Sequence, residues 1–178
     1  MTTQKLKAGG VFPMLSLPKV GGGTLNLGAA ADGYDWQMIV VYRGKHCPIC
    51  TRYLSDLNAV LPDLNGMGID VVAVSADAEN LALEQLADVY PKFAVGYDLS
   101  IAQMQAMGLY ITAPNSRMPV VRHFAEPAVI VTDETGQVKM IDISNVPFMR
   151  PSLDSLTRGL RFVRSQTEPF PVTGSFAG

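Results

Sequence analysis

A buried strand that runs directly into a cysteine-bearing helix start constrains this sequence more than any other stretch. The apolar, β-branched residues 38–42 have the composition and length of a central strand. An Arg-Gly-Lys break follows, and Cys47-Pro48-Ile49-Cys50 then opens an amphipathic helical pattern that continues to about residue 65. This order is typical of the α/β class, so we expect both cysteines in the first helical turn.

The position of these two cysteines, the only ones in the chain, has chemical consequences. Free N–H groups at a helix start carry partial positive charge, which stabilises a thiolate relative to its thiol. Pro48 suits an early helical position because its missing N–H would have no partner there. Nearby side chains that add positive charge are Arg43, Lys45 and Arg52. A reversible Cys47–Cys50 disulfide is therefore predicted.

A metal site is the main alternative use of a C-x-x-C pair. Its completion needs further ligands, and the chain offers only His46 and His123 as nitrogen donors. His46 adjoins Cys47, which is an awkward geometry for a shared metal, and there is no second C-x-x-C. We therefore expect no metal and no other cofactor. A non-enzymatic zinc or interaction domain and inert core cysteines stay open as alternatives.

The composition excludes several classes of protein. The 178 residues are 48% hydrophobic and 17% charged, which suits one globular domain. A net charge of −2 gives neither a nucleic-acid footprint nor a polybasic membrane patch. Residues 1–17 lack the apolar run of a signal peptide, and no apolar run is long enough to span a bilayer. We expect a cytoplasmic protein with no nucleic-acid or membrane partner, where a C-x-x-C is more often catalytic than structural.

The rest of the pattern predicts the order of strands and helices. We expect an N-terminal hairpin over residues 11–17 and 24–27, strands at 69–74, 93–97, 128–132 and 137–143, and helices at 78–89, 101–107 and 153–163. Pro13 places the first strand at an edge, and Pro62 is expected to kink or separate the last turn of the first helix. Together these elements predict a single domain over residues 1–166 and a poorly ordered tail over 167–178.

Residues 110–122 are the least regular segment. Two prolines and an Asn-Ser pair predict a loop, and loops of this length often cover active sites. Arg117 and Arg122 in this loop are candidates for a cation near the cysteines, although solvated loop arginines are the commoner case.

The segment Tyr42-Arg43-Gly44-x-x-Cys47-Pro48-x-Cys50 resembles the active site of the AhpC/TSA peroxiredoxins of the thioredoxin superfamily, in particular peroxiredoxin-like members with an R-G-x-x-C-P-x-C turn. The stretch EPAVIVTDETG, from residue 126, supports the resemblance. It implies an α/β, thioredoxin-like (peroxiredoxin-type) fold, with a central mixed sheet flanked by helices and an N-terminal β-hairpin. It also implies a cis Glu126–Pro127 bond that faces the cysteine turn, where the backbone could pair with an extended thiol substrate.

The sequence departs from this family at two peroxide-activating positions. Typical peroxiredoxins carry P-x-x-x-T-x-x-C before the attacking cysteine. With Cys50 in that place, Arg43 replaces the proline and Cys47 replaces the threonine or serine. Glu126 and Pro127 stand where those enzymes supply an arginine. These departures keep open a thiol–disulfide oxidoreductase without peroxidase activity.

We predict a thiol-dependent antioxidant oxidoreductase that reduces peroxides through Cys47 and Cys50, with Arg43 or a loop arginine stabilising the thiolate. The expected substrate-binding residues are Pro48, Glu126 and Pro127. The expected partners are a peroxide or disulfide substrate and an external thiol reductant, such as a thioredoxin or glutathione system. A homodimer is possible, and the sequence leaves the oligomeric state open.

The order of attack is left open by the sequence. Cys47 lies nearer the helix N-cap and should be the more accessible, whereas Cys50 should have more N–H groups directed towards it. We favour Cys50 for peroxides and Cys47 for disulfides.

Overall fold

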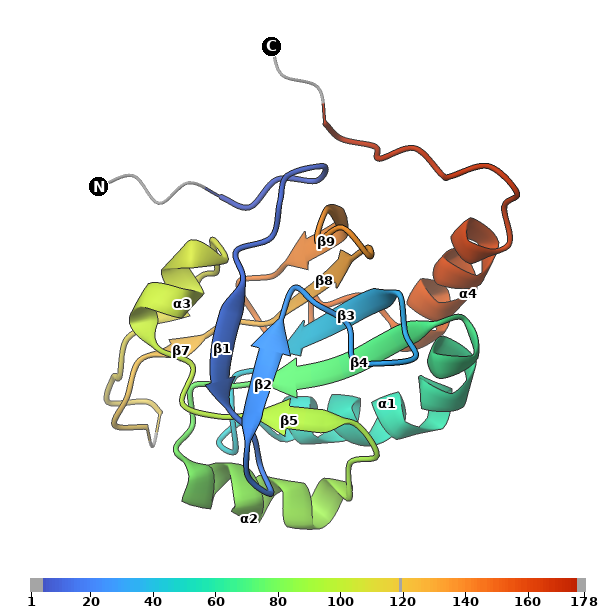
Figure 1. Cartoon of the computed structure of the whole chain (residues 1–178). Coiled ribbons are helices and arrows are strands. Elements are labelled where there is room, and N and C mark those ends of the chain that lie inside the picture. The colour runs from blue at the N-terminus through green and yellow to red at the C-terminus, as the bar shows by residue number, and fades with distance from the viewer. Residues whose placement is uncertain (1–4, 119, 176–178) are drawn as a thin grey trace.

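A mixed five-stranded sheet forms the centre of the computed structural model, which describes residues 5–118 and 120–175 (Figure 1). The strand order is β5 (Ala94–Gly96), β4 (Ile69–Val74), β3 (Trp36–Val41), β8 (Ala128–Thr132) and β9 (Val138–Ile143). Strands β3, β4 and β5 are parallel, and β8 is antiparallel to both β3 and β9. The predicted mixed α/β sheet is confirmed. The predictions for residues 1–4 and 176–178, and for position 119 of the 110–122 loop, lie outside the described residues.

Strand β3 is buried along its whole length because both faces of the sheet are covered. Its alternate residues enter two different cores, Met38 and Val40 one of them and Ile39 and Val41 the other. The first core also takes apolar residues of α1, α2 and α4, and the second takes residues of the N-terminal hairpin and α3. A strand between two cores is fixed in register, so the turn that follows Val41 has a fixed position.

The helices on the first face are α1 (Pro48–Gly66), α2 (Glu79–Val89) and α4 (Leu153–Arg164). Helix α1 ends at Gly66, as predicted, and continues through Pro62 as one helix. The prediction that the last turn is separate from the helix is therefore wrong. The buried residues Leu61 and Leu64 flank the proline and hold that turn against the core.

The second face carries α3 (Ile101–Ala106) and the predicted hairpin, β1 (Leu15–Pro18) with β2 (Thr24–Leu27). The first strand begins later than expected, since Val11 makes only an isolated bridge to Gln137. Pro13 lacks the N–H that a longer ladder would need.

The 110–122 segment contains a short strand that its sequence does not reveal. Strand β6 (Ile111–Thr112) pairs antiparallel with β7 (Phe124–Ala125), and the other described residues of the segment are irregular, as predicted. A strand of two residues is too short to show the alternation of apolar and polar side chains by which a strand is recognised in a sequence.

The chain after α4 follows an extended course (Figure 1). Phe170 packs edge-on against Phe162 of α4, with ring centroids 5.8 Å apart. The poor order expected of this tail stays a prediction. In the described part of the chain, no helix combines the length and the apolar character needed to cross a membrane.

Candidate active site

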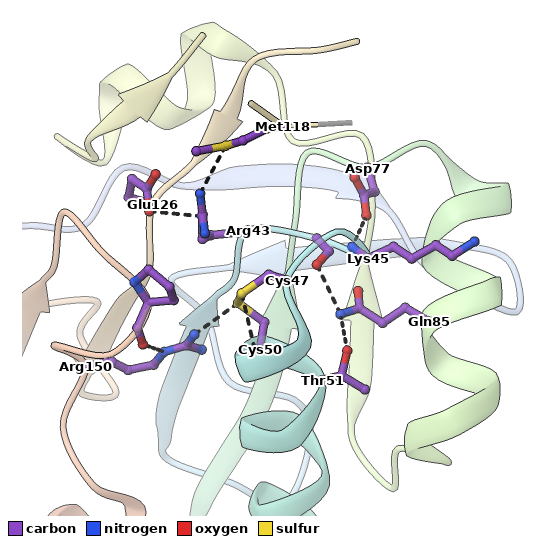
Figure 2. Close-up of a disulfide and its surroundings, with 12 residues drawn as sticks. Arg43, Lys45, Cys47, Cys50, Thr51, Asp77, Gln85, Met118, Glu126 and Arg150 are labelled. Carbon is purple, nitrogen blue, oxygen red and sulfur yellow. Dashed lines mark hydrogen bonds and ion pairs between the residues drawn. A yellow bond between two sulfur atoms is a disulfide. The ribbon is translucent and has the colours of Figure 1, made fainter. Parts of the chain in front are cut away.

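The two cysteines open helix α1, and a disulfide joins them (Figure 2). Cys47 is the N-cap residue, in an extended conformation, and its sulfur accepts a hydrogen bond from the Cys50 N–H (3.3 Å). Pro48 occupies the first helical turn, as predicted, and is exposed. The predicted disulfide is present, and its reversibility stays a prediction.

We call residues 43–50, which contain both cysteines, the redox turn. Two side chains from other parts of the chain hold this turn in place (Figure 2). The carboxylate of Asp77 accepts a hydrogen bond from the Lys45 N–H (2.7 Å). It also lies only 2.5 Å from where a Cβ on Gly44 would be, so this position, with φ +123°, admits only glycine. On α2, Gln85 donates from one nitrogen to the Gly44 carbonyl (3.2 Å) and to Thr51 Oγ1 (2.9 Å). The turn is therefore tied to the segment that follows β4 and to α2.

Arg150 supplies the positive charge at the cysteines. Its Nη2 donates to Cys50 Sγ (3.0 Å), and its guanidinium lies over the Tyr53 ring (4.4 Å to the centroid). The Arg150 Nε donates to the Pro147 carbonyl (3.3 Å), while the buried Nη1 has no hydrogen-bond partner within residues 5–118 and 120–175. Sequence reasoning missed this residue. It lies in an irregular segment before α4, and no local pattern connects it with Cys50.

Arg43, the cation predicted from the motif, directs its side chain elsewhere. Its Nε lies 3.2 Å from Glu126 Oε2, and its Nη2 donates to the Met118 sulfur (3.4 Å). Its guanidinium also lies over the Phe124 ring (4.9 Å). Arg43 therefore stands beside the cysteines, but its guanidinium charge is compensated by Glu126. A catalytic role for Arg43 stays a prediction.

In the reduced pair, Cys50 is the more acidic thiol. A hydrogen bond from the Cys47 thiol, with the charge of Arg150 and a backbone interaction with Arg43, lowers the pKa of Cys50 to about 6 against the opposing effect of burial. Donation to Cys50, together with burial, raises the pKa of Cys47. These directions favour ionisation of Cys50 over that of Cys47 in the reduced pair.

Both cysteines are nearly closed to solvent. Cys47 and Cys50 are 2% and 0% exposed, so Cys47 is the more accessible, as predicted, but only by a small margin. The expectation that more N–H groups of the helix start are directed at Cys50 is wrong. The first-turn N–H of Cys50 is directed at Cys47 Sγ, and the Cys50 sulfur accepts a hydrogen bond from Arg150.

The Glu126–Pro127 bond is trans, so the cis bond implied by the family resemblance is wrong. The chain passes from β7 to β8 with its backbone paired on both sides. The Glu126 N–H donates to the Tyr110 carbonyl (2.8 Å), and the Pro127 carbonyl accepts from the Ser144 N–H (2.9 Å). An extended path of this kind needs no sharp turn. The predicted substrate-binding roles of Glu126 and Pro127 stay predictions.

In the described part of the chain, neither loop arginine forms a hydrogen bond with a cysteine sulfur. Arg117 is exposed, and Arg122 pairs with Asp98 (2.6 Å). Arg122 lines a cleft of ≈ 260 Å³ beside the redox turn, together with His46. Burial, and then the charge of Arg43, lowers the pKa of His46 to about 4, so this side chain is neutral at physiological pH. Among the described residues, no group of three or more His, Cys, Asp or Glu side chains is placed to hold a metal.

The comparison with protein families identifies the chain. The family model for Redoxin matches residues 7–156. The chain belongs to the Redoxin family. This redoxin is therefore a thiol-dependent, peroxiredoxin-like oxidoreductase, as predicted, whereas its place in the R-G-x-x-C-P-x-C subgroup stays a prediction. A search of curated protein sequences finds no match.

Solved structures share the fold of this redoxin at low sequence identity. A peroxiredoxin-like protein from Aquifex aeolicus is 18% identical with a TM-score of 0.72, over 89% of this chain and 88% of that one. Peroxiredoxin 6 of Arenicola marina is 16% identical with a TM-score of 0.76, over 94% and 79%. Peroxiredoxin Q of Xanthomonas campestris is 22% identical with a TM-score of 0.65, over 85% and 92%. The predicted peroxiredoxin-type fold is confirmed.

Proposed function

We propose that this redoxin is a thiol peroxidase in which Cys50 attacks the peroxide and Cys47 resolves the product. The contact between Arg150 and the Cys50 sulfur carries this assignment. A thiolate is the attacking form of cysteine, and the guanidinium, with the Cys47 thiol, favours the thiolate at Cys50.

The proposed reaction uses these groups in order. The Cys50 thiolate attacks one peroxide oxygen, the O–O bond breaks, and the second oxygen leaves as an alkoxide or hydroxide that takes up a proton. The Nη1 of Arg150, which has no hydrogen-bond partner among the described residues, is a donor for that leaving oxygen. Cys47 then attacks the sulfenic acid on Cys50, water leaves, and the disulfide forms. Two equivalents of an external thiol return the pair to the dithiol.

A thiol–disulfide oxidoreductase without peroxidase activity is the second candidate. It is favoured by the ion pair between Arg43 and Glu126, which stand where peroxiredoxins carry a proline and an activating arginine. With those positions paired to each other, Arg150 is left as the cation that contacts a cysteine sulfur.

Sulfenic-acid trapping in two single-cysteine variants tests the assignment. The reduced Cys47→Ser and Cys50→Ser proteins are treated with stoichiometric hydrogen peroxide and then with a sulfenic-acid reagent. We expect rapid labelling of Cys50 in Cys47→Ser, which keeps a hydroxyl donor at position 47, and none in Cys50→Ser. The opposite pattern would reverse the roles, and slow labelling of both would favour the second candidate.

The setting of the enzyme is part of the proposal. We propose a cytoplasmic protein that is reset by a thioredoxin or glutathione system, with a homodimer as its assembly. The cytosolic use of C-x-x-C pairs in catalysis supports the location. Cell fractionation, and sedimentation of the reduced and oxidised protein, check the location and the assembly.

A further inference from the structure

A cleft of ≈ 260 Å³ adjoins the redox turn on the side away from Arg150. Figure 2 shows Arg150 on one side of the disulfide and Lys45 and Asp77 on the other. Lys45 and His46, which precede Cys47 directly, form part of its wall. The other lining residues are Ala76, Asp77, Leu81, Val120, Val121, Arg122, His123 and Phe124. The cleft and the disulfide therefore share one turn.

The cleft offers charges of both signs in a small volume. Asp77 is half-buried, and the charges of Arg122 and Lys45 act on its carboxyl group, although burial outweighs them and raises its pKa. Lys45 pairs with Glu84 and Arg122 with Asp98, but both ion pairs are exposed. Exposed ion pairs contribute little free energy. The carboxylate of a ligand can therefore replace Glu84 at Lys45, or Asp98 at Arg122, with little loss of stability.

His46 and Phe124 provide the uncharged part of the wall. The two rings pack edge-on with centroids 4.5 Å apart. The His46 ring is neutral at physiological pH, so it adds no charge to this part of the wall. The apolar side chains of Leu81 and Val120 complete a pocket that suits the carbon skeleton of a small molecule.

The chemistry of the disulfide decides which sulfur an incoming thiol attacks. In thiol–disulfide exchange the more stabilised thiolate leaves faster. Arg150 stabilises Cys50 as the leaving thiolate, so the attack falls on Cys47. Because Cys47 is only 2% exposed, an attacker held beside the turn has a large advantage over one that arrives by collision.

We propose that the cleft binds a small zwitterionic thiol of the amino-acid type, which reduces the disulfide by attack on Cys47. Its ammonium group pairs with Asp77, and its carboxylate with Arg122 or Lys45. The bound thiolate bonds to Cys47 Sγ, the Cys47–Cys50 bond breaks, and Cys50 leaves as a thiolate. A second thiol then attacks the external sulfur, which releases the external disulfide and a reduced Cys47. This inference rests on the proposed function, since it names the reductant of that cycle.

Four small thiols of similar size and different charge provide the test. The oxidised protein is reduced with cysteine, mercaptopropionate, cysteamine and mercaptoethanol, and the rates are compared per thiolate. We expect cysteine to react about tenfold faster than mercaptoethanol, the effect of one good charged contact, and to saturate. Equal rates for all four thiols, without saturation, would overturn the proposal.

A pair of arginine variants locates the effect. Arg122→Gln should remove most of the advantage of cysteine, whereas Arg158→Gln should keep it, because Arg158 is a similarly exposed and paired arginine on α4. Equal slowing of all four thiols in Arg122→Gln would overturn the proposal, since Arg122 would then act through the fold.

Mass spectrometry of the trapped intermediate identifies the sulfur that is attacked. After brief exposure to cysteine and rapid alkylation, we expect cysteine on Cys47 and alkyl on Cys50, and the reverse would contradict the assignment. The disulfide for this test can be made with a diamide oxidant. A protein that fails to react with peroxide but reduces as described would therefore contradict only the proposed peroxidase function.

Discussion

The guanidinium of Arg150 lies 3.0 Å from the sulfur of Cys50, although the two residues are 100 positions apart in the sequence. Replacement of Arg150 by Met should slow the reaction of the reduced protein with hydrogen peroxide about tenfold to a hundredfold, the range for loss of a charge-assisted hydrogen bond. The rate of Arg150→Lys should fall between those of the unsubstituted protein and Arg150→Met, because a lysine keeps the charge and loses the planar fork of the guanidinium. Stopped-flow rates decide this, with Arg158→Met as the control. A rate unchanged in Arg150→Met would remove Arg150 from the mechanism.

The rate of peroxide reduction should follow the ionisation of Cys50. Its pKa of about 6 predicts a rate that rises with pH, reaches half of its maximum near pH 6 and is flat above neutrality, because only the thiolate attacks. Cys47→Ala should move the midpoint to higher pH, since it removes the donor to Cys50, and Cys47→Ser should move it less. Initial rates of thiol loss across pH measure the midpoints. A midpoint near the ordinary thiol value in the unsubstituted protein would contradict the assignment of Cys50 as the thiolate.

Replacement of Gln85 should change the reduction equilibrium of the Cys47–Cys50 disulfide more than it changes the free energy of unfolding. Its buried Oε1 has no partner among the described residues, so Gln85→Met removes an unsatisfied oxygen together with the two bonds that hold the redox turn. We expect the free energy of unfolding to change by less than about 1 kcal/mol. The disulfide should become about tenfold easier to reduce, which corresponds to about 30 mV.

Asn58 is the matched control for this variant. Its amide also joins α1 to the α2 region, through the Val89 carbonyl (3.0 Å) and the Lys92 N–H (2.9 Å), but far from the redox turn. Asn58→Leu should lower stability and leave the equilibrium with glutathione unchanged. If the two variants shift this equilibrium equally, Gln85 has no positioning role.

The pair of Arg43 and Glu126 should matter for stability as a unit. Their side chains are 13% and 6% exposed, so Glu126→Gln leaves a buried guanidinium without its counter-charge. We expect a loss of about 3 kcal/mol in the free energy of unfolding, and recovery of much of it in the double variant Arg43→Met with Glu126→Gln. Denaturant unfolding of the reduced proteins measures both. Additive losses in the double variant would show that the two side chains are not coupled.

Local patterns predict the fold of this redoxin well because its central elements are regular. The apolar run that becomes β3 and the cysteine-bearing start of α1 are both local features, and they place the redox pair correctly. The hairpin that begins at Leu15 and the short β6 are less regular, and their limits depend on which backbone groups find partners.

Long-range contacts explain why the site is predicted less completely. Arg150 reaches Cys50 only because the segment before α4 packs on α1, where Tyr53 Oη donates to the Pro151 carbonyl (3.1 Å). Gln85 occupies an unremarkable polar position on α2 in the sequence. The trans Glu126–Pro127 bond likewise depends on how β7 and β8 pair with their neighbours. Such contacts join distant parts of the chain and leave no local signal.

The distance in sequence between Cys50 and Arg150 also orders events during synthesis on the ribosome. Domains generally fold as units while the chain emerges, and here Cys50 emerges 100 residues before the guanidinium of Arg150. Until then Cys50 lacks the cation that stabilises its thiolate. The part of the lowering of the Cys50 pKa that Arg150 causes therefore arises only after the segment before α4 has packed on α1.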